Sequence, residues 1–417
     1  MRAGDALGSP LTSLLMIRIE ADLLIPGRGE PQEQGCVVLD RDQISFAGSI
    51  EDAPETPGAE TVAVGTVMPG MWDCHAHLLG LTKPDIEQLV AIPPAVGALR
   101  GLRDANLALR AGFTSLREPG GLGIYLSRAI DEGSVIGPSI YSAAAALSQT
   151  GGHGDIHGFP LDVVRHAPLF ALCDGVPECL KAVRKQLRLG ARLIKVCASG
   201  GVMSEIDHPL HRQFNDEELR AIVDEAARAE RIVAAHCHGK AGIMAALEAG
   251  AKTIEHGTYL DREAAQLMVE KDVVLVPTRF IIEQLLPMKD QLPPYAYEKA
   301  VMVADRHLVA LQIAVEEGVR MAVGTDIFTT GELWGRNGQE CAYLVQAGMT
   351  PLAAIEAATA NGPLTLGPQA PRSGLLAEGY DADVIGLEVD PLDDIWGLAN
   401  AENVSHVWKA GVPVKAP

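Results

Sequence analysis

Short apolar runs alternate with amphipathic stretches through residues 70–369, the middle of the chain. Eight of these runs are candidate strands: MWDCHAH, FTSLRE, SIYSAAAAL, RLIKVCAS, RIVAAHCHG, AKTIEHG, VVLVPTRF and RMAVGTD. Helical periodicity marks the stretches between them, for example AGIMAALEAGA and NDEELRAIVDEAARAER, in which Asp216 is a suitable N-cap. Eight strand–helix units over roughly 300 residues predict a (β/α)8 TIM barrel in the α/β class. A doubly wound sheet is the alternative, and the lack of a GxGxxG motif after any candidate strand disfavours it.

Both ends of the chain are rich in strand patterns. Near the N-terminus MIRIEADLLI alternates, and CVVLD and ISFAG predict a hairpin around Arg41-Asp42. Near the C-terminus ADVIGLEV reads as a strand, and VSHVWKAGVPVKA as a hairpin turning at Ala410-Gly411. We therefore expect residues 16–69 and 370–417 to pair into one small β-sandwich domain that carries the barrel of residues 70–369 as an insertion. Residues 1–15 are expected to be an N-terminal extension.

Charge and composition narrow the range of partners. The chain has 34 basic and 54 acidic residues and a formal net charge of −20, which disfavours nucleic acid and anionic membranes as partners. No segment approaches the ~18 apolar residues of a membrane span, and the N-terminus lacks the basic region of a secretory signal. The seven cysteines are odd in number and scattered, as expected for reduced thiols. These features predict a cytoplasmic protein that acts on a small molecule.

Polar residues with metal-binding side chains stand at the ends of several candidate strands. The segment TVMPGMWDCHAHLLG supplies Asp73, His75 and His77, and histidines two apart on a strand point to the same face. In a barrel, the C-terminal ends of all strands meet on one side of the molecule. This convergence favours a metal site over a set of unrelated core imidazoles. The further members of the set are Lys195 in LIKVCASGG, His236 and His238 in AHCHG, His256 in IEHGT and Asp326 in VGTD.

Taken together, DCHAH, the lysine of LIKVCASGG, AHCHG, IEHGT and GTD resemble the metal-binding signature of the amidohydrolase superfamily, in the subtype with two metals. The similarity covers almost the whole chain, including the split terminal sandwich. More narrowly, TSLREPGG, TGGHGD, IKVCASGGVMS and GYDADVIGL with the ending VWKAGVPV resemble one branch of that superfamily. This branch holds prolidase-like, Xaa-Arg/Lys carboxypeptidase-like and ochratoxin amidohydrolase-like enzymes and lies near imidazolonepropionase.

The resemblance implies a binuclear zinc site with a shared ligand. His75, His77 and Asp326 would hold one metal, His236 and His256 the other, and a carboxylated Lys195 would bridge them. A bridging anion offsets the repulsion between two cations ~3.5–4 Å apart. Lys195 stands between two apolar residues, and burial there would favour the neutral amine that captures CO2.

The resemblance also implies a mechanism in which a metal-bridging hydroxide attacks an amide carbonyl. Asp326 would take the proton of this hydroxide and pass it to the leaving nitrogen. His238 would stabilise the oxyanion or hold a carboxylate, with a structural role as the alternative.

Three further residues are predicted to bind the substrate. His153, in the glycine-rich TGGHGD, is either a substrate contact or part of the loop structure. Tyr259 follows the predicted ligand His256 and is expected to line the pocket. Arg279 in VPTRF would pair either with a substrate carboxylate or with an acid of the protein.

Two departures from the branch fall near the expected substrate pocket. Trp334 stands where the branch carries a histidine, and LREPGG replaces the more usual Arg-Asp. Both leave the predicted metal ligands intact, so they bear on what is bound and not on the metals. The roles of His157, His208 and His211 are open at this point.

The expected function is that of a zinc-dependent enzyme that cleaves an amide next to a free carboxylate, in a dipeptide or an N-acyl amino acid. The first alternative is an enzyme of the same fold that cleaves a cyclic amide, similar to imidazolonepropionase. A mononuclear deaminase would not require Lys195, and a non-catalytic scaffold would be expected to lose ligands that this chain retains. Homo-oligomers are common in the superfamily, and we expect one here.

Overall fold

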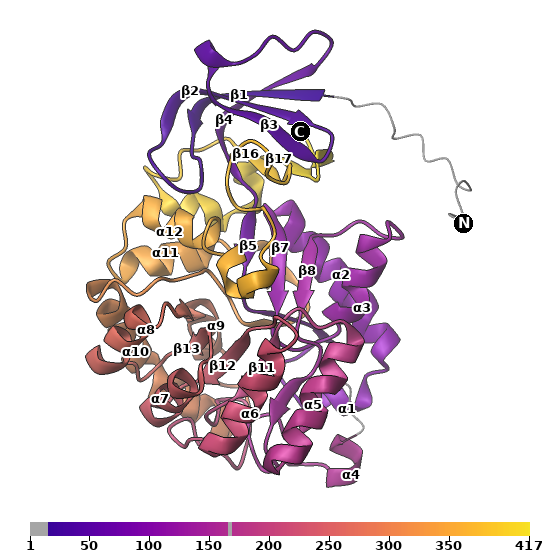
Figure 1. The fold of residues 1–417 in the computed structure, drawn as a ribbon, viewed down its shortest axis with the longest axis vertical. Coiled ribbons are helices and arrows are strands. Elements are labelled where there is room, and N and C mark those ends of the chain that lie inside the picture. Colours follow the sequence, from indigo (N-terminus) through magenta and orange to yellow (C-terminus); the bar gives the residue numbers. More distant parts are fainter. Residues whose placement is uncertain (1–15, 166–168) are drawn as a thin grey trace.

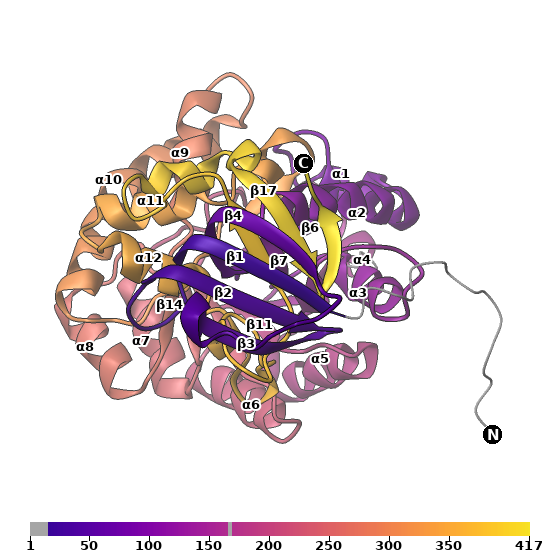
Figure 2. The ribbon, with the colours of Figure 1, turned by 90° about the horizontal axis from the view of Figure 1, so that it is seen from above.

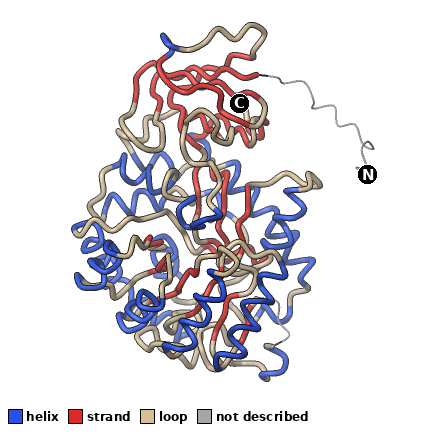
Figure 3. The backbone as a smooth tube through the Cα atoms, in the orientation of Figure 1, coloured by secondary structure: helices blue, strands red, loops and turns tan. Residues whose placement is uncertain are grey.

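The computed structural model describes residues 16–165 and 169–417, so the predicted extension 1–15 lies outside the described residues. A sheet built from both ends of the chain lies at one end of the molecule, and a larger body of strands and helices makes up the rest (Figure 1). In Figure 3 the strands of this body are surrounded by helices. None of the helices in the described ranges is long and apolar enough to cross a bilayer.

The terminal sheet joins the two ends of the chain in one structure. Its seven strands lie in the order β18-β17-β16-β4-β1-β2-β3, and β16 pairs with β4 from Val384 opposite Pro69 to Leu387 opposite Thr66. Both predicted hairpins are present, with Asp40 opposite Gln43 and Lys409 opposite Val412. The strands are β1 (Met16–Leu24), β2 (Gln32–Asp40), β3 (Gln43–Ser49), β4 (Glu60–Pro69), β16 (Val384–Leu387), β17 (Val404–Lys409) and β18 (Val412–Lys415).

A hydrophobic cluster shared by both ends of the chain holds this domain together. It includes Ile19 of β1, Val37 of β2, Val384 of β16 and Trp408 of β17, all almost fully buried. The last strand of the sheet before the barrel, β4, ends at Pro69, and the 3-10 helix that precedes the C-terminal strands of the sheet ends at Gln369. We propose residues 70 and 369 as the domain boundaries on this basis.

Parallel strands form the barrel, which confirms the predicted fold class. Two ladders, β5-β7-β8 and β10-β9-β11-β12-β13-β14, supply its wall, while β6 and β15 pair separately. The strands are β5 (Met71–Asp73), β6 (Ala76–Leu81), β7 (Phe113–Glu118), β8 (Ser139–Ser142), β9 (Ala146–Ser148), β10 (Phe170–Leu172), β11 (Ile194–Cys197), β12 (Val233–Cys237), β13 (Thr253–His256), β14 (Val274–Val276) and β15 (Ile327–Thr329).

Backbone hydrogen bonds outside the ladders close the barrel. The Arg192 N–H donates to the Ser142 carbonyl at 2.9 Å, and the Cys74 N–H donates to the Val323 carbonyl at 2.7 Å. The predicted eighth strand, RMAVGTD, bonds to Cys74 and Leu275 on its two sides but forms one isolated bridge, Met321 to Leu275, and no regular ladder. Extended backbone ends there because Asp326 adopts a left-handed φ of 58°.

Helices surround the barrel, and the sheet of β1–β4 lies across it when the molecule is seen from above (Figure 2). The arrows of β7 and β8 point away from the terminal sheet, so their C-terminal ends face the opposite side (Figure 1). The helices are α1 (Gln88–Ala91), α2 (Pro94–Arg110), α3 (Gly123–Asp131), α4 (Leu161–Val164), α5 (Gly175–Leu189), α6 (Asp216–Ala227), α7 (Lys240–Ala249), α8 (Arg262–Glu270), α9 (Arg279–Leu285), α10 (Pro294–Glu316), α11 (Gln339–Gln346) and α12 (Pro351–Ala358).

The start of α6 corrects one local prediction. Asn215, not Asp216, is the N-cap, because its side chain accepts from the Glu218 N–H while the Glu218 carboxylate accepts from the Asn215 N–H. This reciprocal capping box satisfies two donors at once and fixes where the helix begins. The buried face of the helix then carries Leu219 and Ile222, as its periodicity predicts.

The Asp73 carboxylate fastens the first barrel strand to the segment that completes the ring. One carboxylate oxygen accepts from the N–H groups of His75 and Thr325, each at 3.1 Å. The other accepts from the Thr325 hydroxyl at 2.6 Å and from the Asn337 amide at 2.7 Å. Asp73 is fully buried, so these four bonds compensate for the loss of water around its charge.

We expect Asp73→Ala to destabilise the fold by about 3 kcal/mol, because it leaves several buried donors without an acceptor. Urea denaturation followed by circular dichroism measures this as a lower midpoint. Asp290→Ala, at an exposed aspartate, is the matched control and should unfold like the wild type. Equal midpoints for the two variants would contradict a stabilising role of the Asp73 contacts.

Candidate metal centre

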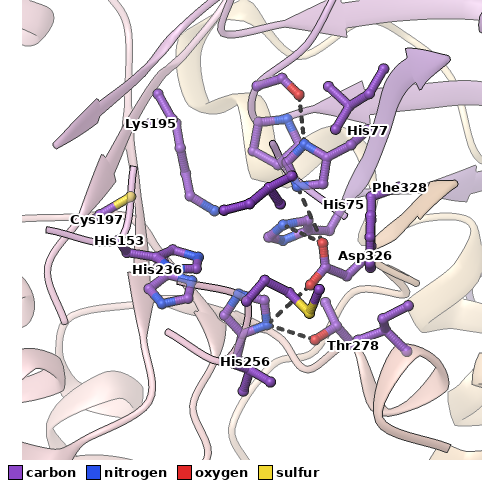
Figure 4. A pocket seen from close by; sticks show the side chains of 18 of the residues that line it. His75, His77, His153, Lys195, Cys197, His236, His256, Thr278, Asp326 and Phe328 are labelled. Carbon is purple, nitrogen blue, oxygen red and sulfur yellow. Dashed lines mark hydrogen bonds and ion pairs between the residues drawn. The ribbon is translucent and has the colours of Figure 1, made fainter. Parts of the chain in front are cut away.

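One pocket gathers the residues that were predicted to bind metal. His75, His77, Lys195, His236, His256 and Asp326 all line it, and His153 and His238 line it as well. Figure 4 shows the imidazoles of His75 and His256 on either side of the Asp326 carboxylate, with the Lys195 side chain directed into the same space. The residues come from different strand ends, as expected for the C-terminal side of a barrel.

Asp326 lies at the centre of the first group of possible ligands. Its carboxylate oxygens are 3.2 Å from Nε2 of His77, 3.5 Å from Nε2 of His75 and 3.9 Å from Nδ1 of His256. The ligand atoms of His75, His256 and Asp326 all fall within 4.8 Å of one another. This spacing suits side chains that share a cation.

A second group consists of histidines alone and shares His256 with the first. The ligand atoms of His236, His238 and His256 also lie within 4.8 Å of one another. The ring centroids of His236 and His256 are 4.6 Å apart, and those of His238 and His256 are 4.8 Å apart. His238 was predicted to face the substrate, and its position beside two predicted ligands allows it to reach either a metal or a substrate bound next to one.

Strained backbone directs two of these side chains into the pocket. His256 and Asp326 have φ values of 69° and 58°, in the left-handed region that residues with a Cβ seldom adopt. Thr278 has a φ of 59° and places its hydroxyl 2.7 Å from Nδ1 of His256. Such strain is typical of functional sites, where the surrounding structure enforces it.

Hydrogen bonds set the ring orientation of His75 and His77. Nδ1 of His75 lies 2.7 Å from a Glu255 carboxylate oxygen, and Nδ1 of His77 lies 2.5 Å from the Gly120 carbonyl. Both partners are acceptors, so each Nδ1 carries the proton and each Nε2 is free to bind a metal. The sequence had marked neither Glu255 nor Gly120 as part of the site.

Arg117 and Glu255 form a fully buried ion pair behind His75. The Arg117 guanidinium donates to the Glu255 carboxylate at 2.5 Å and to the Cys74 carbonyl at 2.5 Å. Burial opposes ionisation of Glu255, but Arg117 and His75 together lower its pKa below the usual range. Charged residues inside the apolar runs FTSLRE and AKTIEHG were the signal that points to this pair.

The ionisation states of the pocket residues suit metal binding. Burial lowers the pKa of His75 to about 4 and that of His238 to about 3, so both imidazoles are neutral near pH 7. Burial opposes ionisation of Asp326, but the nearby histidines and Lys195 lower its pKa and keep it a carboxylate. Neutral imidazoles and a carboxylate are the donor forms that divalent cations bind.

Lys195 is the remaining buried group at the centre of the site. Its side chain is almost fully buried, and burial lowers the pKa of the amine. Within residues 16–165 and 169–417, no group hydrogen-bonds to this amine. The described residues therefore fit a metal centre that includes a modified or neutral lysine.

Arg279 and Tyr259 do not line the pocket among the described residues, although Thr278 and Ile281 do. The Arg279 guanidinium donates to the Glu283 carboxylate at 2.9 Å and to the Ala304 carbonyl at 2.5 Å. Of the two partners predicted for Arg279, a substrate carboxylate or an acidic residue of the protein, the structure shows the second, Glu283. The Tyr259 ring faces the Arg306 guanidinium, 5.9 Å from its centroid.

The side chains of the two departures from the branch pattern lie behind the pocket wall, although Pro119 and Gly120 of LREPGG line the pocket. Trp334 is fully buried and donates its indole N–H to the Thr329 carbonyl at 2.9 Å. Glu118, in LREPGG, accepts from the Ser142 hydroxyl at 2.6 Å and from the Gly123 N–H at 3.0 Å. Neither is among the described residues that line the pocket.

Comparison with known proteins decides the family. The model of the Amidohydrolase family matches residues 66–414. The chain is an amidohydrolase. Ochratoxinase of Aspergillus niger is 45% identical over an alignment of 420 positions, which covers 96% of this chain and 86% of that protein. The crystal structure of A. niger ochratoxinase superposes on this amidohydrolase with a TM-score of 0.92 and covers 96% of both chains.

Two solved peptidase structures are similar as well. A prolidase complexed with N-methylphosphonate-L-proline is 32% identical, with a TM-score of 0.89, and covers 96% of this amidohydrolase and 100% of its own chain. A Xaa-Pro dipeptidase with bound methionine is 29% identical, with a TM-score of 0.87 and the same coverage. These similarities confirm the predicted family and branch, and they indicate an enzyme that hydrolyses amides.

We expect Glu255→Gln to weaken divalent metal binding by 10- to 100-fold, the usual effect of removing a carboxylate that orients a histidine ligand. The amide keeps the size of the side chain but removes the charge that pairs with Arg117. Competition with a chromophoric chelator measures the metal affinity. Glu248→Gln, at an exposed glutamate of α7, is the control, and equal affinities in both variants would contradict the role of Glu255.

Proposed function

We propose that this amidohydrolase is a binuclear, zinc-dependent hydrolase that cleaves the amide bond between an acyl group and an amino acid with a free carboxylate. The observation that carries this proposal is the convergence of four histidines and Asp326 on the buried Lys195 amine. In this proposal His75, His77 and Asp326 hold one metal, and His236 and His256 hold the other. Nitrogen and oxygen donors of this kind suit zinc.

Carboxylated Lys195 is the proposed bridge between the two metals. A neutral amine reacts with CO2, loses a proton and becomes a carbamate, whose two oxygens carry one negative charge. The lowered pKa and the burial of Lys195 support this role, because both favour the neutral amine. A shared anion also reduces the repulsion between two neighbouring cations.

When bound, the metals would lower the pKa of water and polarise the amide carbonyl. Asp326 has the position and the ionisation state to accept the proton of the attacking water and to deliver it to the leaving nitrogen. His238 is neutral near pH 7 and has Nδ1 2.7 Å from the Thr258 hydroxyl. It would act through a hydrogen bond to the oxygen of the reacting carbonyl and not as a charged acid.

The walls of the pocket indicate the kind of acyl group. Apart from the metal-binding set, the lining is mostly apolar, and no arginine of the described residues takes part in it. An apolar or aromatic acyl group therefore fits this space. The apolar lining includes Leu79, Ile86, Leu89, Leu169, Phe170, Val202, Met203, Ile281, Ile282, Leu285, Val303 and Phe328.

His153 is the proposed contact for the amino-acid part of the substrate. Its ring stacks on His236 with centroids 4.3 Å apart, and its Nδ1 lies 2.9 Å from the Ser204 hydroxyl. The names of the relatives agree with a substrate that contains an amino acid, since one holds a phosphonate derivative of proline and another holds methionine. Arg279 and Tyr259 have no part in this proposal, because they face protein groups.

The cysteines support the proposed cytoplasmic location. All seven are buried and unpaired, which is typical of a reducing compartment. Assembly into a homo-oligomer stays a prediction, and light scattering in solution tests it.

The first test measures metal content by elemental analysis together with hydrolysis. The substrate panel contains ochratoxin, N-acyl amino acids, Xaa-Pro and Xaa-Arg dipeptides, and a lactam. We expect about two metals per chain and cleavage of the acyclic amides, both lost in Lys195→Ala because the bridge is removed. Lys185→Ala, at an exposed lysine of α5, should change neither. About one metal per chain, retained in Lys195→Ala, would exclude the carbamate bridge.

The second test concerns the apolar wall. Phe328→Ala should raise the KM for a substrate with an aromatic acyl group by roughly tenfold, because about 1.5 kcal/mol or more of apolar contact is lost. The KM for the corresponding N-acetyl substrate and the metal content should stay the same. Val301→Ala, at a half-exposed residue of α10, is the control. An equal rise for both substrates would contradict contact between Phe328 and the acyl group.

A further inference from the structure

The loop of residues 200–214, between β11 and α6, forms one wall of the pocket. Val202 and Met203 line the pocket directly. The loop also contacts His153, since the Ser204 hydroxyl lies 2.9 Å from its Nδ1 and a Cβ at Gly201 would lie 2.1 Å from its ring. The conformation of this loop therefore affects both the Val202–Met203 part of the apolar wall and the position of His153.

Little regular structure holds this loop in place. The only β-bridge recorded for its described residues joins Ser199 to Arg212 at its two ends. Carbonyl groups of a loop that is folded into the protein require donors, and here they cannot come from a strand or helix of the loop itself. Some donors are local, since the His211 carbonyl accepts from the Gly200 N–H at 3.0 Å and the His208 carbonyl accepts from the His211 N–H at 2.9 Å. Others come from another part of the barrel.

Lys299 of α10 supplies the donors for three of the loop carbonyls. Its Nζ donates to the carbonyls of Ser204 and Asp207, both at 2.6 Å, and to the Gly201 carbonyl at 3.3 Å. It also lies 3.6 Å from a carboxylate oxygen of Asp207. The side chain of Lys299 is 11% exposed, so the ammonium exchanged most of its water for these loop oxygens.

Asp207 extends the contact through the rest of the loop to His153. Its other carboxylate oxygen accepts from the backbone N–H of Gly201 at 2.9 Å and from the side-chain NH2 group of Gln213 at 3.2 Å. The side-chain oxygen of Gln213, Oε1, in turn accepts from the backbone N–H of His153 at 3.1 Å. A continuous set of hydrogen bonds thus leads from the Lys299 ammonium to both the backbone and the ring of His153.

We propose that Lys299 is a positioning residue for substrate binding, which holds the loop of residues 200–214 in the conformation that places His153, Val202 and Met203. It does not touch the metal-binding residues, so it acts on the fit of the substrate and leaves the metal centre intact. The kinetic part of this proposal rests on the proposed function. Its structural part, the order of the loop, does not.

Lys299→Met is the test, because methionine keeps an apolar stem of similar length and removes the ammonium. We expect hydrogen exchange of the amides in residues 200–214 to accelerate by roughly tenfold or more, since the loop opens more readily. The KM should rise by roughly tenfold with a much smaller change in kcat, at unchanged metal content. Lys299→Arg should restore part of both effects, because a guanidinium also donates to carbonyls.

Lys185→Met, at an exposed lysine of α5, is the matched control and should match the wild type in every measurement. Wild-type exchange of the loop in Lys299→Met would overturn the proposal, and so would a loss of kcat or metal with an unchanged KM. If Lys299→Met does not fold, Lys299→Gln provides the same comparison. If the wild-type enzyme cleaves no member of the substrate panel, the proposed function fails, and the exchange measurement still decides the role of Lys299.

Discussion

The centre of this barrel contains charged groups that water does not reach, and each must be compensated by a neighbour. Arg117 and Glu255 are such groups, and both belong to a network around His75 that also reaches the Asp326 carboxylate. Removing water from a single charge would cost several kcal/mol, so the network is stable only when the charges balance. The ion pair of Arg117 with Glu255 does this behind His75. On the other side of His75, the proposed metals would compensate for the negative charge of Asp326.

This constraint also explains the arrangement of the surrounding backbone. Asp73 accepts four hydrogen bonds and thereby fixes the end of β5 against Thr325, one residue before Asp326. Left-handed conformations at His256 and Asp326 then bring these side chains to His75. The site thus rests on rigid strand ends, while part of the substrate wall, Val202 and Met203, belongs to a loop to which Lys299 donates three hydrogen bonds. Loops tolerate sequence changes better than strands do. Related barrels can therefore bind different substrates through changes in such a loop while the strand ends that hold the site stay the same.

Sequence patterns predicted the barrel, the terminal β domain and the gathering of histidines, because strand periodicity and the topology of a barrel determine where strand ends meet. They failed where a contact joins residues that are distant in sequence and share no pattern. The contacts of Lys299 with the loop of residues 200–214 and of Gly120 with His77 follow from the packing of whole elements. Arg279 is a different case: its partner Glu283 is only one helical turn away, and the sequence left open whether such an acid or the substrate would pair with it. RMAVGTD has the composition of a strand and bonds to both neighbouring strands, but it forms no continuous ladder.

The pairing of β4 with β16 has a consequence for how the chain is made. During synthesis β4 emerges before the barrel, whereas its antiparallel partner β16 emerges only after the whole barrel has been made. Until then one edge of β4 has no partner from this chain, and contacts between such distant segments form slowly. Assembly of the terminal sheet is therefore a late event, and the nascent chain needs protection of that edge from other strands.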